Sequence, residues 1–194
     1  MPVSGFWNTV RTDLARYVGK SELSKRRMLR TIYWEPGFQG VFVYRFGRLL
    51  LSKGDVILLW PLLALGWVAY ALMVLVIRKG YDIGLSLSAE IGPGFYVGHF
   101  GGVEVHGCRM AENCSVGQLT KVGAADQVDG PQIGSGVWIG SHAKIPAPVK
   151  VGDQATIAPG ARVLKDVPPK ALIVGDPGRV VFRGFDNSRI LPGR

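Results

Sequence analysis

Aliphatic residues recur at intervals of six along the second half of the chain. They form three series, of which the last is unbroken: Leu85, Ile91, Val97, Val103; then Met110, Val116, Val122; then Ile133, Ile139, Ile145, Val151, Ile157, Val163. A period of six matches neither an α-helix nor the alternation of a flat strand. It does place one inward side chain on each face of a triangular solenoid with about eighteen residues per coil. The pattern therefore predicts a mainly β protein in which residues 81–182 form a left-handed parallel β-helix.

Glycine often follows the aliphatic residue of the repeat, which favours a tight corner at that point. This occurs at Gly92, Gly98, Gly123, Gly134, Gly140 and Gly152. Two irregularities separate the series: a step of seven residues from Val103 to Met110, and an insert from Ala124 to Gln132. Inserts in a solenoid become external loops, often on the binding face. We expect helices before residue 80 and the Pro-rich segment after Val163 to cover the solenoid ends, with residues 183–194 as a C-terminal tail.

An uncharged apolar run occupies residues 56–77 and reads VILLWPLLALGWVAYALMVLVI. As a helix it is long enough to cross a bilayer core of about 30 Å. However, Pro61 interrupts the run after its first turn, and basic residues flank both ends, which favours keeping both ends on the cytoplasmic side. We therefore predict a monotopic or re-entrant pair of short helices in membrane lipid. A spanning helix and a soluble oligomer-interface helix are the alternatives.

The rest of residues 1–80 is basic and predicted to be helical. Short basic helices are expected at 21–29 and 42–51, split by a turn at Glu35-Pro36-Gly37. The net charge of +9 is concentrated in this region, and one cluster comprises Lys20, Lys25, Arg26, Arg27 and Arg30. Anionic lipid is the expected partner, and a solvated helical face is the alternative. No nucleic acid is expected, because zinc-finger spacing, RNP-type motifs and basic zippers are absent from the sequence.

The two cysteines and the N-terminal residues bear on the compartment. Cys108 and Cys114 are too few for a disulfide framework, and Met1-Pro2-Val3-Ser4 does not begin a signal peptide. The expected location is therefore the cytoplasmic face of the bacterial inner membrane.

Five stretches of the repeat region resemble the serine acetyltransferase family over residues 82–182. They read IGPGFYVGHFGGVEV, CSVGQLTKVG, IGSGVWIGSHAKI, VGDQATIAPGARVLKDVPP and VGDPGRVV. Within that family the chain is most similar to the shorter, membrane-associated O-acetyltransferases of exopolysaccharide, capsule and colanic-acid biosynthesis. The resemblance implies an acetyl-CoA-dependent O-acetyltransferase that forms a homotrimer, with acetyl-CoA in grooves between neighbouring β-helices.

Several departures from serine acetyltransferases bear on the acceptor. Fewer than 85 residues precede the repeat, which leaves no room for the family's long helical domain. Gly98-His99 replaces the family's Asp-His, residues 129–133 replace its Arg-His-Pro-Lys-Ile loop, and the chain ends without the family's isoleucine tail. We therefore expect a saccharide acceptor: a sugar hydroxyl of a polysaccharide or of its lipid-linked or nucleotide precursor. The alternatives are a serine O-acetyltransferase of cysteine biosynthesis and a non-catalytic membrane scaffold.

Transfer of acetyl from a thioester to an alcohol requires a base, and histidine is the side chain best suited to that task near pH 7. His99 matches the family's catalytic histidine and lies in a glycine-rich corner, so it is the predicted general base. Asp82 precedes it by seventeen positions and is predicted to lie beneath it and orient its ring. Glu104 and Asp126 are the other carboxylates considered.

The resemblance also points to residues for acetyl-CoA. His106 is either a site residue or an exposed turn residue. Lysine and arginine can pair with the coenzyme's phosphates, which points to Lys165 and Arg179. The alternative for both is a solvated residue at the end of the domain. The predicted cofactor-binding residues are Gly123, Ala124, Gly140, His142, Ala143, Lys165 and Arg179.

Zinc is the main rival explanation for the histidines. Carbonic anhydrases with a β-helix bind zinc through three histidines with a long gap before a short one, whereas residues 99, 106 and 142 have the short gap first. A site made of His106, Cys108 and Cys114 is conceivable. Two cysteines six residues apart are explained more simply by a repeated small position, so no metal is expected.

Overall fold

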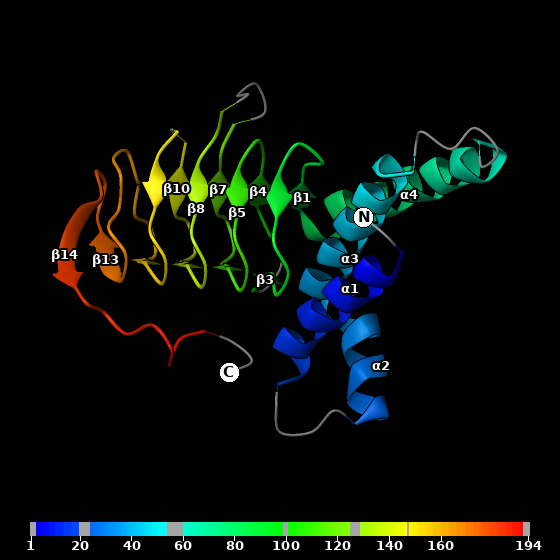
Figure 1. Ribbon diagram of the computed structural model, residues 1–194, viewed down its shortest axis with the longest axis horizontal. Helices are drawn as coiled ribbons and strands as arrows, with labels where there is room; N and C mark the ends of the chain where they lie inside the picture. The colour runs from blue at the N-terminus through cyan, green and yellow to red at the C-terminus, as the bar shows by residue number, and fades with distance from the viewer. Residues whose placement is uncertain are drawn as a thin grey trace.

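The computed structural model describes residues 3–19, 24–53, 60–98, 101–124, 129–146 and 148–191. Helices gather at one end and a parallel β-helix extends away from them (Figure 1). The predicted fold class, a mainly β solenoid preceded by an apolar helical region, is confirmed. The predicted boundaries at residues 80 and 182 fall next to the end of α4 (Trp60–Tyr81) and within β14 (Arg179–Arg183).

The solenoid has three faces and four coils, and its strands pair in parallel from coil to coil. The first face contains β1 (Ile83–Leu85), β4 (Val103–Val105), β7 (Lys121–Val122) and β10 (Lys144–Ile145). The second face contains β2 (Glu90–Ile91), β5 (Arg109–Met110), β8 (Gln132–Ile133) and β11 (Lys150–Val151). The third face contains β3 (Tyr96–Val97), β6 (Ser115–Val116), β9 (Trp138–Ile139), β12 (Thr156–Ile157) and β13 (Ala171–Val174), followed by antiparallel β14.

The aliphatic positions of the repeat form the core, as expected, with one change of register. Val105, not Val103, pairs with Val122, which in turn pairs with Ile145. Val103 is also fully buried, because residues two apart on a strand share a face. The assignment of Val103 to the six-residue series was therefore wrong. The step from Val97 to Val105 is two residues longer than the repeat.

Four helices precede the solenoid: α1 (Val3–Val18), α2 (Lys25–Trp34), α3 (Pro36–Leu51) and α4. The predicted turn at Glu35-Pro36-Gly37 is wrong, because only Glu35 separates α2 from α3. Pro36 occupies the first turn of α3, where its missing N–H has no helical partner to lose. α1 lies within the region predicted to be helical, but its bounds were not predicted.

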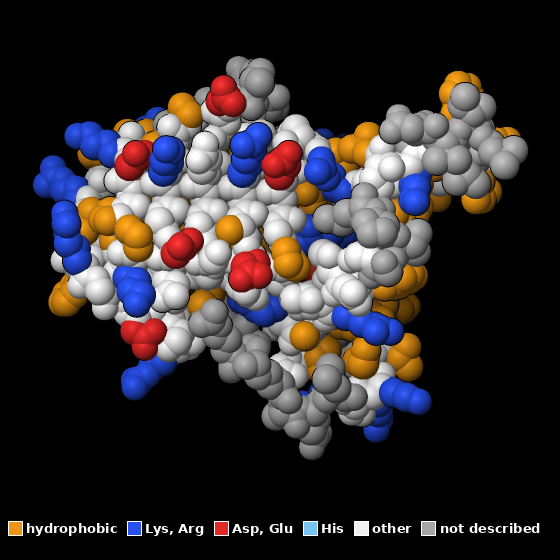
Figure 2. Space-filling model, viewed as in Figure 1, with side chains coloured by type: hydrophobic (Ala, Val, Ile, Leu, Met, Phe, Trp, Pro, Cys, Tyr) orange, Lys and Arg blue, Asp and Glu red, His pale blue; other side chains and the backbone are white. Residues whose placement is uncertain are grey.

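α4 is one continuous helix from Trp60 to Tyr81, so the described part of the apolar run forms a single helix and not the predicted pair. Pro61 lies in the first turn, where proline is tolerated. In the part of the chain that the structure describes, α4 is the one helix long and apolar enough to cross a membrane. Residues 56–59 of the apolar run lie outside the described residues. Figure 2 shows hydrophobic side chains gathered at this helical end of the molecule.

Side chains of the helices satisfy the backbone of the first coil, which has no coil beneath it. The Tyr44 hydroxyl donates to the Ala89 carbonyl at 2.8 Å and accepts from the Ile91 N–H at 3.2 Å. The Tyr17 hydroxyl accepts from the Val97 N–H at 2.8 Å. An open edge of β-structure otherwise presents unpaired backbone groups, so α1 and α3 act as the cap that a solenoid end requires.

The other end is closed by the β13–β14 hairpin and by residues 184–191, which run back along the solenoid (Figure 1). The buried Asn187 side chain donates to the Gly136 carbonyl at 2.9 Å and to the Gln154 carbonyl at 3.0 Å. Leu191 is also buried. Asn187 and Leu191 therefore hold residues 184–191 on the corner loops between the second and third faces.

Replacing Asn187 with alanine should lower the free energy of unfolding by about 1–3 kcal/mol, because two buried carbonyls lose their donor. Urea denaturation of the full chain measures this change. Ser188→Ala is the matched control, because the Ser188 hydroxyl bonds only the neighbouring Asp186 at an exposed position. An Asn187→Ala variant as stable as the wild type would show that the tail does not support the fold.

Candidate active site

The loops that lead from the third face back to the first stack into one edge, named here the third-to-first edge. It consists of residues 98–102, 117–120, 140–143 and 158–161. Backbone hydrogen bonds join neighbouring loops: Leu119 N–H donates to the Gly101 carbonyl at 2.7 Å, and His142 N–H donates to the Gln118 carbonyl at 2.8 Å. Sequence segments more than forty residues apart therefore lie along one edge.

The first loop of this edge contains the two extra residues of the repeat. Its two ends are held by the neighbouring backbone: Gly98 N–H donates to the Val116 carbonyl at 2.8 Å and Gly101 N–H to the Tyr81 carbonyl at 3.0 Å. Gly102 has φ +64°, and a Cβ there would lie 2.4 Å from a Leu119 methyl carbon, so this position requires glycine. The predicted base His99 falls between these held ends and lies outside the described residues. Its role stays a prediction.

Asp82 lies at the foot of the third-to-first edge. Its carbonyl accepts from Val103 N–H at 3.1 Å, its φ is +51°, and its side chain is exposed. The register pairs Ile83 with Val103, so Asp82 stacks beneath Gly102 and not beneath position 99. The expected seventeen-residue spacing is therefore wrong, because the longer loop raises the spacing to twenty. Asp82 nevertheless shares an edge with residues 98–102.

Of the two other carboxylates considered, the structure describes one. Glu104 points outward from the first face, and its carboxylate lies 3.0 Å from the Lys121 ammonium. Both side chains are about half exposed, so this is a surface ion pair of small energetic value. Asp126 lies outside the described residues.

The predicted cofactor-binding residues divide between two edges of the prism. Gly140, His142 and Ala143 belong to the third-to-first edge, two coils along from residues 98–102. Gly123 and Ala124 belong to the loops between the first and second faces, named here the first-to-second edge. A Cβ on Gly123 would lie 2.0 Å from the His106 carbonyl oxygen, which requires glycine there. One protomer does not bring the two groups together.

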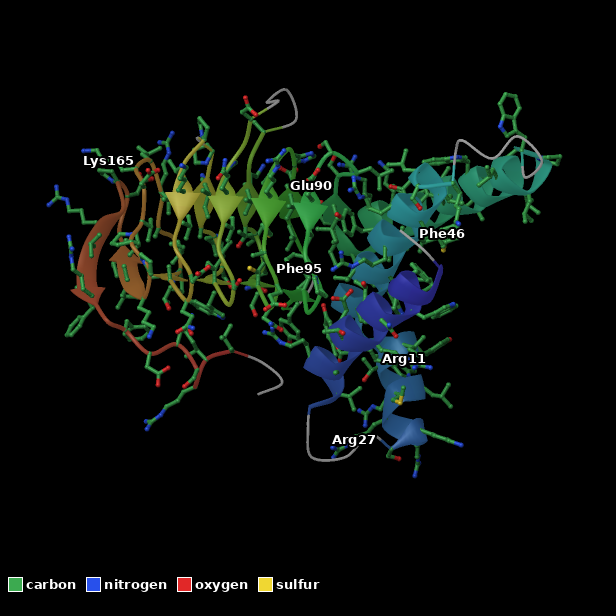
Figure 3. The ribbon with its side chains drawn as sticks, in the orientation of Figure 1. Arg11, Arg27, Phe46, Glu90, Phe95 and Lys165 are labelled. Carbon is green, nitrogen blue, oxygen red and sulfur yellow. The ribbon has the colours of Figure 1, made fainter. Side chains whose placement is uncertain are left out.

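The two predicted phosphate-binding residues lie near the end of the solenoid away from the helices. Lys165 projects from the last loop of the first-to-second edge (Figure 3), and Arg179 begins β14. Both side chains are exposed. They are available to an anion, but within one protomer they lie three coils beyond the loop that contains position 99.

The remaining histidines sit on different edges. His142 is exposed in a left-handed conformation with φ +62°, on the same edge as residues 98–102. His106 is half-buried on the first-to-second edge, where its backbone N–H donates to the Val122 carbonyl at 2.9 Å. Over the described ranges, no three His, Cys, Asp or Glu side chains lie close enough together to hold a metal ion.

Both cysteines occupy the small inward position just before a strand. Cys108 precedes β5 and Cys114 precedes β6, and both are buried. Burial raises the pKa of the Cys108 thiol to about 12 and that of Cys114 to about 11. A protonated, buried thiol is a poor metal ligand and a poor nucleophile. These positions support the interpretation of a repeated small residue.

Both thiols should therefore resist modification in the folded protein. With a disulfide reagent that releases a coloured thiolate at pH 8, the native chain should react at least about 100-fold more slowly than the chain in urea, because only the small thiolate fraction reacts. Reaction of either cysteine within seconds in the native protein would contradict this placement.

Comparisons with known proteins support these features of the fold. Residues 130–165 match the family model described as bacterial transferase hexapeptide (six repeats). Over 157 residues the chain is 29% identical to serine acetyltransferase from Mycobacterium tuberculosis, which covers 79% of this chain and 64% of that protein. The chain thus spans less than two thirds of that relative. This match gives no support to the expected closeness to exopolysaccharide and colanic-acid enzymes.

Solved structures of serine acetyltransferases share the fold. That of the Vibrio cholerae enzyme has a TM-score of 0.77 at 23% identity and covers 97% of this chain and 70% of its own. That of the Brucella abortus enzyme in complex with coenzyme A has a TM-score of 0.73 at 23% identity and covers 93% and 69%. Such coverage includes the N-terminal helices, which were expected to lie outside the resemblance. The chain therefore contains a match to the hexapeptide-repeat model at residues 130–165, is similar in sequence to serine acetyltransferases, and shares their fold.

Proposed function

We propose that the chain is an acetyl-CoA-dependent O-acetyltransferase. The observation that carries this proposal is the likeness to serine acetyltransferases along nearly the whole chain, through the helices as well as every coil. The sequence adds a chemical reason, because His99 is the residue predicted to act as general base and lies in the glycine-rich segment 98–102.

The proposed reaction uses this chain's residues as acid and base. His99 accepts the proton of the acceptor hydroxyl as its oxygen attacks the thioester carbonyl carbon. When the tetrahedral intermediate collapses, the carbon–sulfur bond breaks and the coenzyme A thiolate takes that proton from His99. Asp82, on the same edge, is the carboxylate proposed to orient the imidazole. The product is an O-acetyl ester and free coenzyme A.

A complete site is proposed to need more than one protomer. The predicted acetyl-CoA residues lie on two edges that a single chain keeps apart. In a homotrimer, the third-to-first edge of one solenoid can face the first-to-second edge of its neighbour, so that Gly140 and Ala143 of one subunit and Gly123 of the next border the same groove. Analytical ultracentrifugation tests the trimer, and a monomeric active enzyme would contradict it.

Serine is the first candidate acceptor. The most similar relatives reported above carry that name, and the helical region expected to be missing is part of the shared fold. The comparisons therefore favour the serine alternative over the saccharide acceptor predicted first.

A sugar hydroxyl remains the second candidate because of one segment of the structure. Residues 129–133 lack the arginine and histidine of the corresponding family loop, and the structure places Gln132 in β8 and buries Pro131. A Cβ on Gly130 would lie 1.8 Å from the Gly107 carbonyl oxygen, so the backbone here packs tightly against the next coil. The described part of this loop offers a carboxylate, Asp129, where the family has a cation.

Acceptor assays with the purified full chain separate these proposals. Release of free thiol from acetyl-CoA is followed with L-serine, with nucleotide sugars and with polysaccharide fragments, and the product is identified by mass spectrometry. Turnover with serine alone supports the first candidate, and turnover with a saccharide alone supports the second. No turnover, together with no heat of acetyl-CoA binding in calorimetry, would overturn the proposal and favour a non-catalytic scaffold.

A further inference from the structure

One face of α4 is apolar along its length and is not covered by the described chain. The exposed fractions are 66% at Leu65, 60% at Leu72 and 61% at Val76. Trp60, Leu62, Val68 and Leu75 are more than half exposed as well. Exposed apolar area on this scale marks an interaction surface.

The apolar surface continues from α4 onto the other helices. A groove of about 690 Å³ runs between Leu72 and Val76 of α4, Ile32 of α2 and Trp7 of α1. On α2, the side chains of Leu29, Tyr33 and Trp34 are each about 70% exposed. All four helices therefore contribute to one apolar end of the molecule, which we call the helical end.

The charge around the helical end is predominantly positive. Before Asp82 the sequence contains twelve of the 23 basic residues but only four of the 14 acidic ones. Among the described residues of α1 to α4, the one acidic side chain is Asp13, which is buried against Arg45. Exposed basic residues lie on α1, α2 and the last turn of α4, and two of them are labelled in Figure 3. They are Arg11, Lys25, Arg26, Arg27, Arg30, Arg78 and Lys79.

The packing of α4 on α3 decides which side of α4 can contact a membrane. The two helices run antiparallel in close contact, because Gly66 faces Leu50 and Gly47 faces the Tyr70 ring. α3 is tied in turn to the solenoid, since Arg48 donates to the Leu87 carbonyl at 3.1 Å. The inner side of α4 thus packs on α3, where Ile77 is buried and the other contacting side chains are half-buried. The outer side is the more exposed, and it is the side that would meet lipid, as in a helix that lies in the membrane interface.

We propose that the helical end docks into one leaflet of an anionic membrane, with the outer face of α4 in the acyl region and the basic residues of α2 at the headgroups. Anionic headgroups complement the basic rim, and the acyl chains cover the apolar face. A second copy of this chain fits less well, because symmetric pairing would bring two basic rims together. Docked in this way, the solenoid projects from the membrane with Lys165 at its far end (Figure 3).

Vesicle flotation with the purified full chain tests the proposal. Vesicles of phosphatidylcholine alone are compared with vesicles that contain 30% phosphatidylglycerol, about the anionic content that attracts basic segments. The chain should bind the anionic vesicles at least about tenfold more tightly. No binding to either composition would overturn the proposal.

Variants at exposed positions identify the surface without disturbing the core. Leu65→Glu with Leu72→Glu should weaken binding to both vesicles at least about 100-fold, because two leucines no longer enter the acyl region. Arg26→Ala with Arg27→Ala and Arg30→Ala should weaken binding to anionic vesicles alone, by about 100-fold. Val181→Glu is the matched control, since Val181 is 59% exposed at the opposite end and should leave binding unchanged. Unchanged binding of the leucine variant would contradict the proposal.

Two further experiments distinguish docking in one leaflet from a spanning helix and from an interface between copies of this chain. Cysteines introduced by Lys53→Cys and Lys79→Cys, near the two ends of α4, should both react with a membrane-impermeant maleimide from the cytoplasmic side, because docking in one leaflet leaves both ends at the headgroups. The native cysteines give little background because they are buried. Reaction of Lys53→Cys from the opposite side alone would show a spanning helix. If the wild type does not bind vesicles but forms an oligomer that the leucine variant does not form, the apolar face is an interface between copies of this chain. Either result would overturn docking in a single leaflet.

Discussion

Replacing His99 with alanine should lower kcat by about 10²–10⁴-fold, which is the usual contribution of a positioned general base. Binding of acetyl-CoA should remain, because the residues proposed for the cofactor are on other coils. Thiol release gives kcat, and calorimetry gives the affinity for acetyl-CoA.

A second substitution separates proton transfer from positioning. His99→Asn keeps a hydrogen-bonding side chain of similar size but has no group that takes a proton near pH 7, so it should be as inactive as His99→Ala. In the wild type, kcat/KM should fall toward acid pH, because a protonated imidazole cannot accept the proton of the acceptor hydroxyl. An asparagine variant that keeps more than a tenth of the activity, or a flat pH profile, would rule out His99 as the base.

The solenoid could be predicted because each repeat contains its own local signal. The aliphatic residue and the following glycine specify one strand and one corner, regardless of the rest of the chain. Local signals did not settle the register at Val103 and Val105, because both are buried on one short strand. That ambiguity hid the longer loop at residues 98–102, and it produced the wrong spacing for Asp82.

The helical region was harder to predict because its contacts connect distant parts of the sequence. The four-residue spacing of Phe6, Val10, Leu14 and Val18 was the available signal for α1, and these residues are indeed buried. Nothing local indicates that the hydroxyl of Tyr17 would meet the backbone of Val97, 80 residues away. For the same reason, sequence spacing could not show that the proposed cofactor residues lie on two separate edges.

A buried ion pair connects α1, α3 and the first coil. The Arg45 guanidinium donates to the Asp13 carboxylate at 2.9 Å, and the two side chains are only 4% and 1% exposed. The same carboxylate accepts from Phe95 N–H at 2.9 Å, while Arg45 also donates to the Gly92 carbonyl at 2.6 Å. Burial raises the pKa of the Asp13 carboxyl, although Arg45 and these hydrogen bonds oppose the shift.

Asp13→Ala should lower the free energy of unfolding by about 3–5 kcal/mol, because it leaves the Arg45 charge buried without its counter-ion. Urea denaturation at a fixed protein concentration measures the loss. Asp153→Ala is the matched control: its carboxylate also accepts a backbone N–H, from Ser135 at 2.7 Å, but it is exposed and should cost about 1 kcal/mol or less. A loss in Asp13→Ala no larger than in this control would contradict the prediction.

Because the pKa of Asp13 is raised in the folded state, this carboxyl should make the free energy of unfolding depend on pH. A carboxyl that binds its proton more tightly in the folded state contributes stability that is fully present below its unfolded pKa of about 3.9 and is lost as the pH rises through its folded pKa. Asp13→Asn keeps an oxygen acceptor for Phe95 but does not titrate. The stability of Asp13→Asn relative to the wild type should therefore improve as the pH rises from about 3.9 through the folded pKa of Asp13. Urea denaturation of both proteins at several pH values measures this difference. A difference that is constant with pH, or that grows against the variant, would show that burial does not raise the pKa of the Asp13 carboxyl above its unfolded value.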